Sequence, residues 1–253
     1  GVIGGDDVTV SGSFAFADPN AGVAKNILIS GLALNGADAN NYVLAPGVAA
    51  TATITPASLS VTADALSKIY GDADPGLTFN FSGFVGGDNS SLFTGGLVRA
   101  AGETVAGGPY AIGQGTLSAG GNYIIDFTGA NFTITPKALS VNVAADDKVY
   151  DATVTATGTI LGLTGIVGGD DVTANGSGTF AFTDANVGAG KMVNVTGLAL
   201  SGSGAGNYTL SPTASSSASI TPASLSVTAD AQTKTYGDAD QAFTFNFSGF
   251  VGG

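Results

Sequence analysis

The sequence has no cysteine, no histidine and no tryptophan, and only 7 of its 253 residues are lysine or arginine. Without cysteine and histidine there is no disulfide, no thiolate chemistry, no zinc site with sulfur or nitrogen ligands and no imidazole for acid–base catalysis. Most enzyme mechanisms therefore lose their usual groups. We expect a protein that is not an enzyme.

Positive charge is therefore scarce. The 19 acidic residues outnumber the basic ones and give the chain a formal net charge of −12. Such a field repels the phosphate backbone, so nucleic acid is not an expected partner. There is no apolar run of about 18 residues, and Gly1 does not open a basic, hydrophobic leader. We therefore predict no membrane span and no signal peptide in this segment.

What the sequence does contain is 40 glycines, 44% apolar residues and only 10% charged residues. This composition indicates a folded, turn-rich β protein rather than a disordered acidic tail or a helical protein. Apolar side chains at every second position predict strands, since alternate residues of a strand face the same side. The clearest predicted strands are residues 59–63, 77–81, 123–127 and 132–134.

One short helical turn is predicted within residues 87–94. Asp88 or Asn89 can cap it with a side-chain oxygen, which would place Leu92 and Phe93 on the core.

The sequence repeats. Residues 54–64 return unchanged at 220–230, a shift of 166 (220 − 54), and residues 4–8 return at 168–172. A weaker likeness relates residues 134–141 to 54–61, a shift of 80 (134 − 54). Two related kinds of module therefore alternate, which is typical of proteins in which each module contacts mainly its neighbours.

Each module begins near a Leu-Ser-Val segment and ends near Ile-Thr-Pro, where proline interrupts the strand ladder. We place a first module at residues 1–57 without its initial strands, a second at 58–137, a third at 138–223 and a truncated fourth at 224–253. Modules of this size have small cores. We expect an all-β tandem array of small β-sandwich or β-grasp-like modules forming an elongated rod, with at most one short helical turn in each module of the second kind.

Two families are suggested by these motifs. Lys-Xaa-Tyr-Gly-Asp at residues 68–72 and 234–238, followed by Phe-Xaa-Phe-Ser-Gly-Phe-Val-Gly-Gly, resembles the bacterial MBG domain of the YGX type. The other kind of module, with Lys-Val-Tyr-Asp at 148–151 and Gly-Gly-Asp-Asp at 168–171, resembles the YDG domain, although Ala152 replaces the usual glycine. The resemblance implies a secreted or cell-surface bacterial adhesin of the filamentous-haemagglutinin-like kind.

Paired acidic residues in the predicted turns are candidate calcium ligands, because carboxylate oxygens suit this ion and calcium stiffens many extracellular repeats. The competing interpretation is that these aspartates only cap their own turns, and no segment matches an EF-hand loop. We expect no other cofactor. The candidate calcium ligands are Asp6, Asp7, Asp72, Asp74, Asp170, Asp171, Asp238 and Asp240.

Two tyrosine motifs recur in the modules. The tyrosine of Lys-Xaa-Tyr (Tyr70, Tyr150, Tyr236) is predicted to cover the core with its hydroxyl hydrogen-bonded, while the lysine stem covers apolar surface. The alternative is an amide cross-link between the lysine and an asparagine. Asn-Tyr at 41–42, 122–123 and 207–208 predicts a turn followed by a buried residue, with a carbohydrate platform as the alternative.

These patterns predict a structural repeat segment that gives length and a surface for assembly or display outside the cell. Its partners would be copies of itself or neighbouring repeats. The alternative is an adhesive binding module whose loops recognise glycans or surface proteins.

Overall fold

The computed structural model describes residues 1–45, 47, 49–176 and 178–251, so residues 252–253 of the predicted fourth module lie outside the described residues. The described residues are all-β, with helical content limited to single 3₁₀ turns: η1 (Ala39–Asn41), η2 (Ser90–Leu92) and η3 (Ala205–Asn207). The all-β class and the β-sandwich modules are confirmed. No helix among the described residues has the length and apolar character needed to cross a membrane.

Contacts divide the chain into two compact units. The first consists of residues 1–67, 74–102 and 109–133, and the second consists of 68–73, 103–108 and 134–253. Two loops of the second module, 68–73 and 103–108, therefore belong to the second unit.

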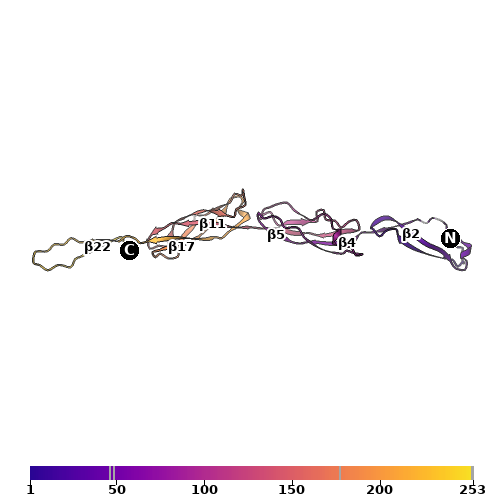
Figure 1. Cartoon of the computed structure of the whole chain (residues 1–253), viewed down its shortest axis with the longest axis horizontal. Coiled ribbons are helices and arrows are strands. Elements are labelled where there is room, and N and C mark those ends of the chain that lie inside the picture. The colour runs from indigo at the N-terminus through magenta and orange to yellow at the C-terminus, as the bar shows by residue number, and fades with distance from the viewer. Residues whose placement is uncertain (46, 48, 177, 252–253) are drawn as a thin grey trace. The chain divides into compact units, whose positions relative to one another are not determined.

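The first module is one antiparallel sheet in the order β1-β2-β3. Its strands are β1 (Thr9–Phe16), β2 (Gly22–Asn35) and β3 (Ala50–Ile54) (Figure 1). Phe14 and Phe16 on β1 are exposed, whereas their counterparts in the third module, Phe180 and Phe182, are buried. Among the described residues of the first module, no second sheet packs on these rings.

The second module has two sheets, in the orders β6-β4-β9 and β5-β10-β8-β7. Leu59 and Val61 on β4 and Phe132 on β10 are fully buried in its core. The strands are β4 (Ala57–Ala63), β5 (Leu66–Ile69), β6 (Phe79–Ser82), β7 (Val98–Arg99), β8 (Tyr110–Gly113), β9 (Tyr123–Thr128) and β10 (Ala130–Thr135).

The third module contains the sheets β14-β11-β19, β12-β20-β17-β16-β13 and β15-β18. Val193 and Val195 on β17 and Ile220 on β20 are fully buried beneath the aromatic rings of β16. The strands are β11 (Lys137–Ala145), β12 (Lys148–Val149), β13 (Thr155–Ala156), β14 (Gly158–Thr164), β15 (Thr173–Asn175), β16 (Thr179–Phe182), β17 (Gly188–Thr196), β18 (Ala199–Ser201), β19 (Tyr208–Leu210) and β20 (Thr213–Thr221).

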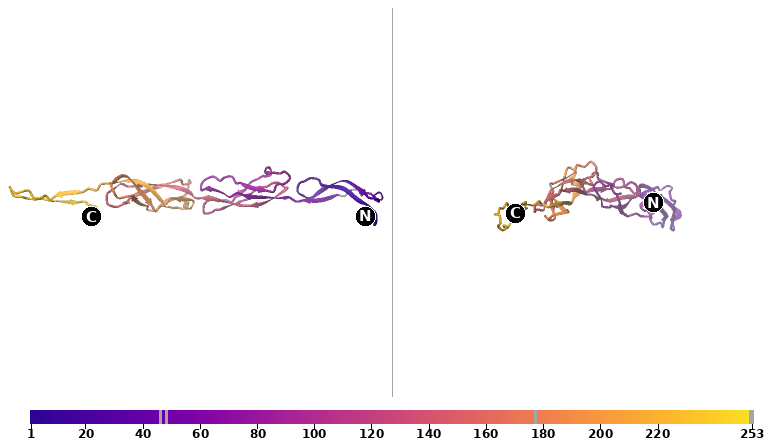
Figure 2. Two further views of the ribbon diagram at one scale, coloured as in Figure 1. Left: turned by 90° about the horizontal axis from the view of Figure 1, so that it is seen from below. Right: turned by 60° about the vertical axis from the view of Figure 1, so that its left-hand side comes forward.

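The fourth module is a single pair of antiparallel strands, β21 (Ser226–Ala229) and β22 (Phe245–Ser248), drawn in yellow in Figure 2. Leu225 is 49% exposed, although its counterpart Leu59 in the second module is completely buried. The sequence of this segment is the same in both places, but Leu59 packs in one core cluster with Leu117 and Tyr123, and the described residues of the fourth module include no counterparts of these two.

Most of the predicted strands lie where the alternation placed them, but the segment 77–81 is shifted, since β6 begins at Phe79. The predicted helical turn is η2, and Asn89 caps it by accepting the Ser91 N–H. Phe93 packs on the core as expected. Leu92 does not, because it closes the tight turn with its side chain toward solvent, and it is exposed.

The predicted module boundaries fall at short connections. β4 and β11 begin at Ala57 and Lys137, one residue before the predicted starts, and Pro56 and Pro136 separate them from the preceding strands.

Candidate functional site

A tight turn of the form Xaa-Gly-Gly-Asp occurs in each of the first three modules. In the second module the Asp88 N–H donates to the Val85 carbonyl at 3.1 Å, which closes the turn. Gly86 and Gly87 adopt φ values of 67° and 93°, a left-handed backbone that glycine enters without steric cost.

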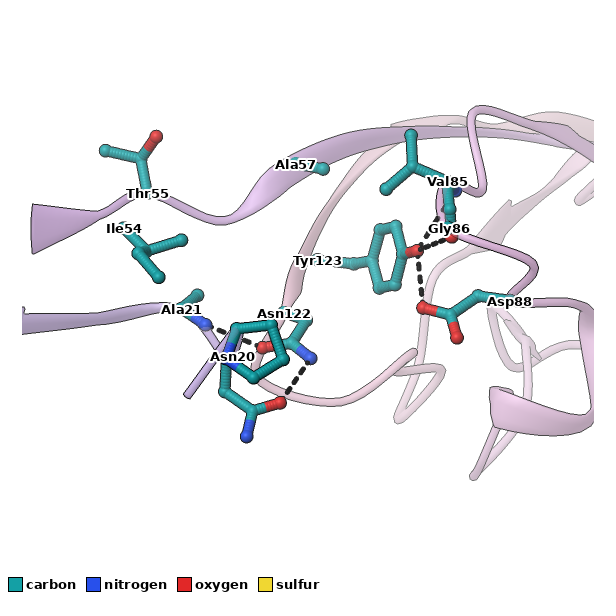
Figure 3. A pocket seen from close by; sticks show the side chains of 11 residues that line it. Asn20, Ala21, Ile54, Thr55, Ala57, Val85, Gly86, Asp88, Asn122 and Tyr123 are labelled. Atoms are coloured by element: carbon teal, nitrogen blue, oxygen red, sulfur yellow. Dashed lines mark hydrogen bonds between the residues drawn. The ribbon is translucent and has the colours of Figure 1, made fainter. Parts of the chain in front are cut away.

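A buried tyrosine bonds both ends of this turn (Figure 3). The Tyr123 hydroxyl accepts the Val85 N–H at 3.1 Å and donates to the Asp88 carboxylate at 2.7 Å. Tyr123 is the first residue of β9, which pairs in parallel with β4 so that Tyr123 lies beside Ala57. This pairing brings the Tyr123 hydroxyl to the turn at residues 85–88.

The same arrangement recurs, and we call it the tyrosine clamp: a tyrosine hydroxyl bonded to the first N–H and the last carboxylate of an Xaa-Gly-Gly-Asp turn. In the first module Tyr42 accepts from Ile3 at 2.9 Å and donates to Asp6 at 2.5 Å. In the third module Tyr208 accepts the backbone N–H of Val167 at 2.9 Å and donates to Asp170 at 2.5 Å.

A second tyrosine reaches the clamp of the third module. The Tyr70 hydroxyl also donates to the Asp170 carboxylate, at 2.9 Å, and its ring lies edge-on to Tyr208 with the centroids 5.3 Å apart. The Tyr70 N–H donates to the Thr135 carbonyl at 2.9 Å. A tyrosine of the second module is therefore bound to the turn of the third, with all these residues inside the second unit.

The shared carboxylate changes the acidity of these phenols. Burial, followed by the hydrogen bond to Asp170, raises the pKa of both Tyr70 and Tyr208 above the usual 10.0. For Tyr123 the bond from the Val85 N–H lowers the pKa, but burial and the Asp88 carboxylate outweigh it and the net pKa is raised.

The asparagines before the clamp tyrosines of the second and third modules reach the preceding module. Asn122 Oδ1 accepts the Ala21 N–H at 2.8 Å, and its Nδ2 donates to Asn20 Oδ1 at 3.0 Å. Asn207 Oδ1 likewise accepts the Val105 N–H at 2.9 Å. Asn122-Tyr123 and Asn207-Tyr208 therefore each join a loop of one module to the Xaa-Gly-Gly-Asp turn of the next.

The lysines of the Lys-Xaa-Tyr motifs bind carboxylates. Lys68 pairs with Glu103 at 2.5 Å and Lys148 pairs with Asp151 at 2.7 Å. The hydrogen bond from Lys148 is the main reason why the pKa of Asp151 falls to about 2. Lys148 Nζ also lies 5.5 Å from the centre of the Phe182 ring, within cation–π distance.

The aspartates predicted as calcium ligands take part in hydrogen bonds and ion pairs. Asp6 and Asp170 accept clamp hydroxyls, and Asp7 and Asp171 accept backbone N–H groups at 3.2 and 3.1 Å. Asp74 pairs with Arg99 and Asp240 with Lys234, both at 2.5 Å, while the N–H groups of Asp72 and Asp238 close turns. Among the described residues no three acidic side chains gather as an ion site. Calcium binding stays a prediction.

Sequence reasoning did not foresee the clamps, although a signal was present. Gly-Gly-Asp and Asn-Tyr occur together in each of the first three modules, with 35 to 38 residues between the aspartate and the tyrosine. A constant pairing of a turn with a distant tyrosine is the pattern expected of a contact between them.

Small β modules in series, three of them carrying the same tyrosine clamp, define a class of tandem β-sandwich repeat protein. The chain belongs to the YDG domain family, whose model matches residues 1–53 and 135–216. The MBG domain model of the YGX type matches residues 59–133 and 225–253. No curated protein and no solved structure matches the chain significantly. The resemblance inferred from the motifs is confirmed.

Proposed function

We propose that this chain is a structural repeat segment of an extracellular bacterial adhesin or filament, giving length and a surface for assembly or display. One observation carries the proposal: side chains of the same type join a module to its neighbour at successive junctions. Asn122 does so in the first unit, and Asn207 with Tyr70 does so in the second.

The physical reason is that repeated contacts restrain each module relative to its neighbour. Tyr70 is bonded to a carboxylate and is partly buried against Tyr208, so bending at this point breaks hydrogen bonds and exposes a ring. Because the first two junctions both use an asparagine side chain, modules can be added without designing a new interface. Such an array suits a stalk or fibre.

The proposal includes the location and the lack of catalysis. Membership of the YDG family and the match to the MBG domain support a repeat role at the bacterial surface. The proposed partners are neighbouring repeats or further copies of the chain, and no turnover of a substrate is expected.

Small-angle scattering tests the stalk directly. For the wild-type chain we expect an extended particle with a narrow distribution of lengths. A chain carrying both Asn122→Ala and Asn207→Ala should show a broader distribution at unchanged secondary structure, because both inter-module amide contacts are removed. A compact wild-type particle contradicts the stalk.

The competing adhesive function is tested with the same protein on a glycan array and in binding to host-cell surface proteins. Saturable binding that is lost on changing loop residues would favour the adhesive module. Hydrolysis of a polysaccharide panel would contradict the absence of catalysis, and protease shaving of intact cells tests the extracellular location.

A further inference from the structure

A cavity of about 420 Å³ lies within the first unit, between the end of β3 and the clamp of the second module (Figure 3). Its walls are the Asn20 loop, the Ile54-Thr55 segment and the clamp turn, with Tyr123 and Asp88 at one side. The lining residues are Pro19, Asn20, Ala21, Ile54, Thr55, Ala57, Val85, Gly86, Asp88, Asn122 and Tyr123.

The corresponding position in the second unit is filled by a tyrosine. There Thr135 takes the place of Thr55, and Asp170 and Tyr208 take the places of Asp88 and Tyr123. Tyr70 lies among them, donating its N–H to the Thr135 carbonyl and its hydroxyl to Asp170. The walls of the cavity in the first unit are thus those that surround Tyr70 in the second.

The turns at residues 85–88 and 167–170 differ in solvent exposure, and the less exposed one is the one that Tyr70 contacts. Val167 and Asp170, which Tyr70 contacts or bonds, are half-buried. Val85 is 57% exposed, and Asp88 is exposed as well, although both turns are clamped in the same way by their own tyrosines. The outer side of the turn at residues 85–88 is therefore exposed, and an aromatic ring can pack on it.

The strand next to the cavity has an open edge. In the third module β20 lies between β17 and β12, and Lys148 on β12 pairs in parallel with Ile220. The Tyr150 N–H then donates to the Thr221 carbonyl at 2.8 Å. In the first module β3 pairs with β2, and no other described strand lies on its outer edge. Such an edge accepts an extended segment by adding a strand to the sheet.

The observations also identify the kind of segment. Two tyrosines donate their backbone N–H to an Ile-Thr-Pro segment of their own module, Tyr70 to Thr135 and Tyr150 to Thr221. For β3, which ends at Ile54 just before Thr55, that module is of the YDG kind. Residues 1–57 contain no Lys-Xaa-Tyr segment of their own.

We propose that the cavity is a socket for the tyrosine of an extended Lys-Xaa-Tyr segment from the first strands of a YDG domain, the segment that Lys148–Asp151 represents in this chain. The segment pairs with the outer edge of β3, its tyrosine N–H donates to the Thr55 carbonyl, and its hydroxyl donates to Asp88. Its lysine lies over the ring of Phe16, as Lys148 lies over Phe182. This inference concerns what binds the cavity and does not depend on the array acting as a stalk.

The test places a copy of residues 137–164 directly before Gly1 of the full chain, since Gly1 is the counterpart of Gly165. Amide hydrogen exchange is measured at 50–55 and 85–88, with and without the extension. We expect exchange in both segments to slow at least tenfold. Changing the extension's tyrosine, the copy of Tyr150, to alanine should restore fast exchange at 85–88 while 50–55 remains protected.

Two matched measurements make the outcome decisive. Asp88→Asn should weaken the effect of the extension at 85–88 more than Asp64→Asn, a change outside the cavity. Equal exchange at 85–88 with the tyrosine and alanine extensions overturns the socket, and so does an extension that leaves 50–55 unprotected. Concentration-dependent association of the unextended chain that is abolished by Tyr236→Ala would assign the cavity to a second copy and overturn the proposed occupant.

Discussion

The hydroxyl of Tyr70 donates a 2.9 Å hydrogen bond to the carboxylate of Asp170, 100 residues further along the chain. The same carboxylate accepts the hydroxyl of Tyr208 at 2.5 Å. One acidic side chain therefore holds its own module's tyrosine and a tyrosine from the preceding module. This shared acceptor makes the clamp both a local turn contact and a contact between modules.

Removing the clamp hydroxyl should destabilise the third module. Tyr208→Phe leaves the Val167 N–H without its acceptor and takes a donor from Asp170, so we expect a loss of about 1.5–3 kcal/mol in the free energy of unfolding. Urea denaturation followed by circular dichroism measures it. The control is Tyr236→Phe, which should change stability by less than about 0.5 kcal/mol because Tyr236 is fully exposed. Equal stability of the two variants would show that the clamp contributes nothing.

High pH should weaken the same contacts. The folded-state pKa values of Tyr70 and Tyr208 lie above the usual 10.0, so the folded protein binds these protons more tightly than the unfolded chain does. Their stabilising contribution is complete below about pH 10 and is lost as the pH rises through the folded-state pKa. Unfolding free energies measured from about pH 9 upward should fall more steeply for the wild type than for Tyr70→Phe. Identical slopes would argue against the raised pKa.

The repeats allow a matched test of core packing. Leu59 is completely buried and its counterpart Leu225 is 49% exposed, although the residues next to them in the sequence are the same. Leu59→Ala should cost about 2–5 kcal/mol, since it opens a cavity in the core cluster that Leu59 forms with Leu117, Ala119 and Tyr123. Leu225→Ala should cost less than half as much in thermal or urea unfolding. Similar losses would mean that Leu225 is packed in solution.

The contact of Asn207 can be followed through the amide hydrogen of Val105, which donates to its side chain. In Asn207→Ala the Val105 N–H loses the side-chain oxygen that accepts it, so its amide hydrogen should exchange about 2- to 10-fold faster. Asn131→Ala on the exposed face of β10 is the control and should leave the exchange of Val105 unchanged. Unchanged exchange in Asn207→Ala would mean that the contact is not populated.

The alternation of apolar residues was enough to predict several strands, but not how they pair into sheets. Strands around Leu59, Tyr123 and Phe132 lie where the pattern placed them, because one face of each strand is buried. The cap at Asn89 was also predictable, as it depends only on neighbouring residues. Leu92 was misplaced because the direction of its side chain depends on the fold of the tight turn.

The clamps and junctions could not be derived in the same way. Asp170 was predicted as a turn residue or a calcium ligand, and the hydrogen bonds that its side chain accepts come from tyrosines 38 and 100 residues away. Those contacts depend on the parallel pairing of β11 with β19, which joins strands at opposite ends of the module. Local propensity carries no information about such long-range pairing.

A double-mutant cycle on Tyr70 and Asp170 tests the claim that modules are joined through a shared tyrosine–aspartate contact. Unfolding free energies are measured for the wild type, Tyr70→Phe, Asp170→Asn and the double variant, so the loss of the Tyr208 bond cancels in the cycle. We predict a coupling energy of about 0.5–3 kcal/mol. Effects that simply add, with no coupling energy, would contradict the account.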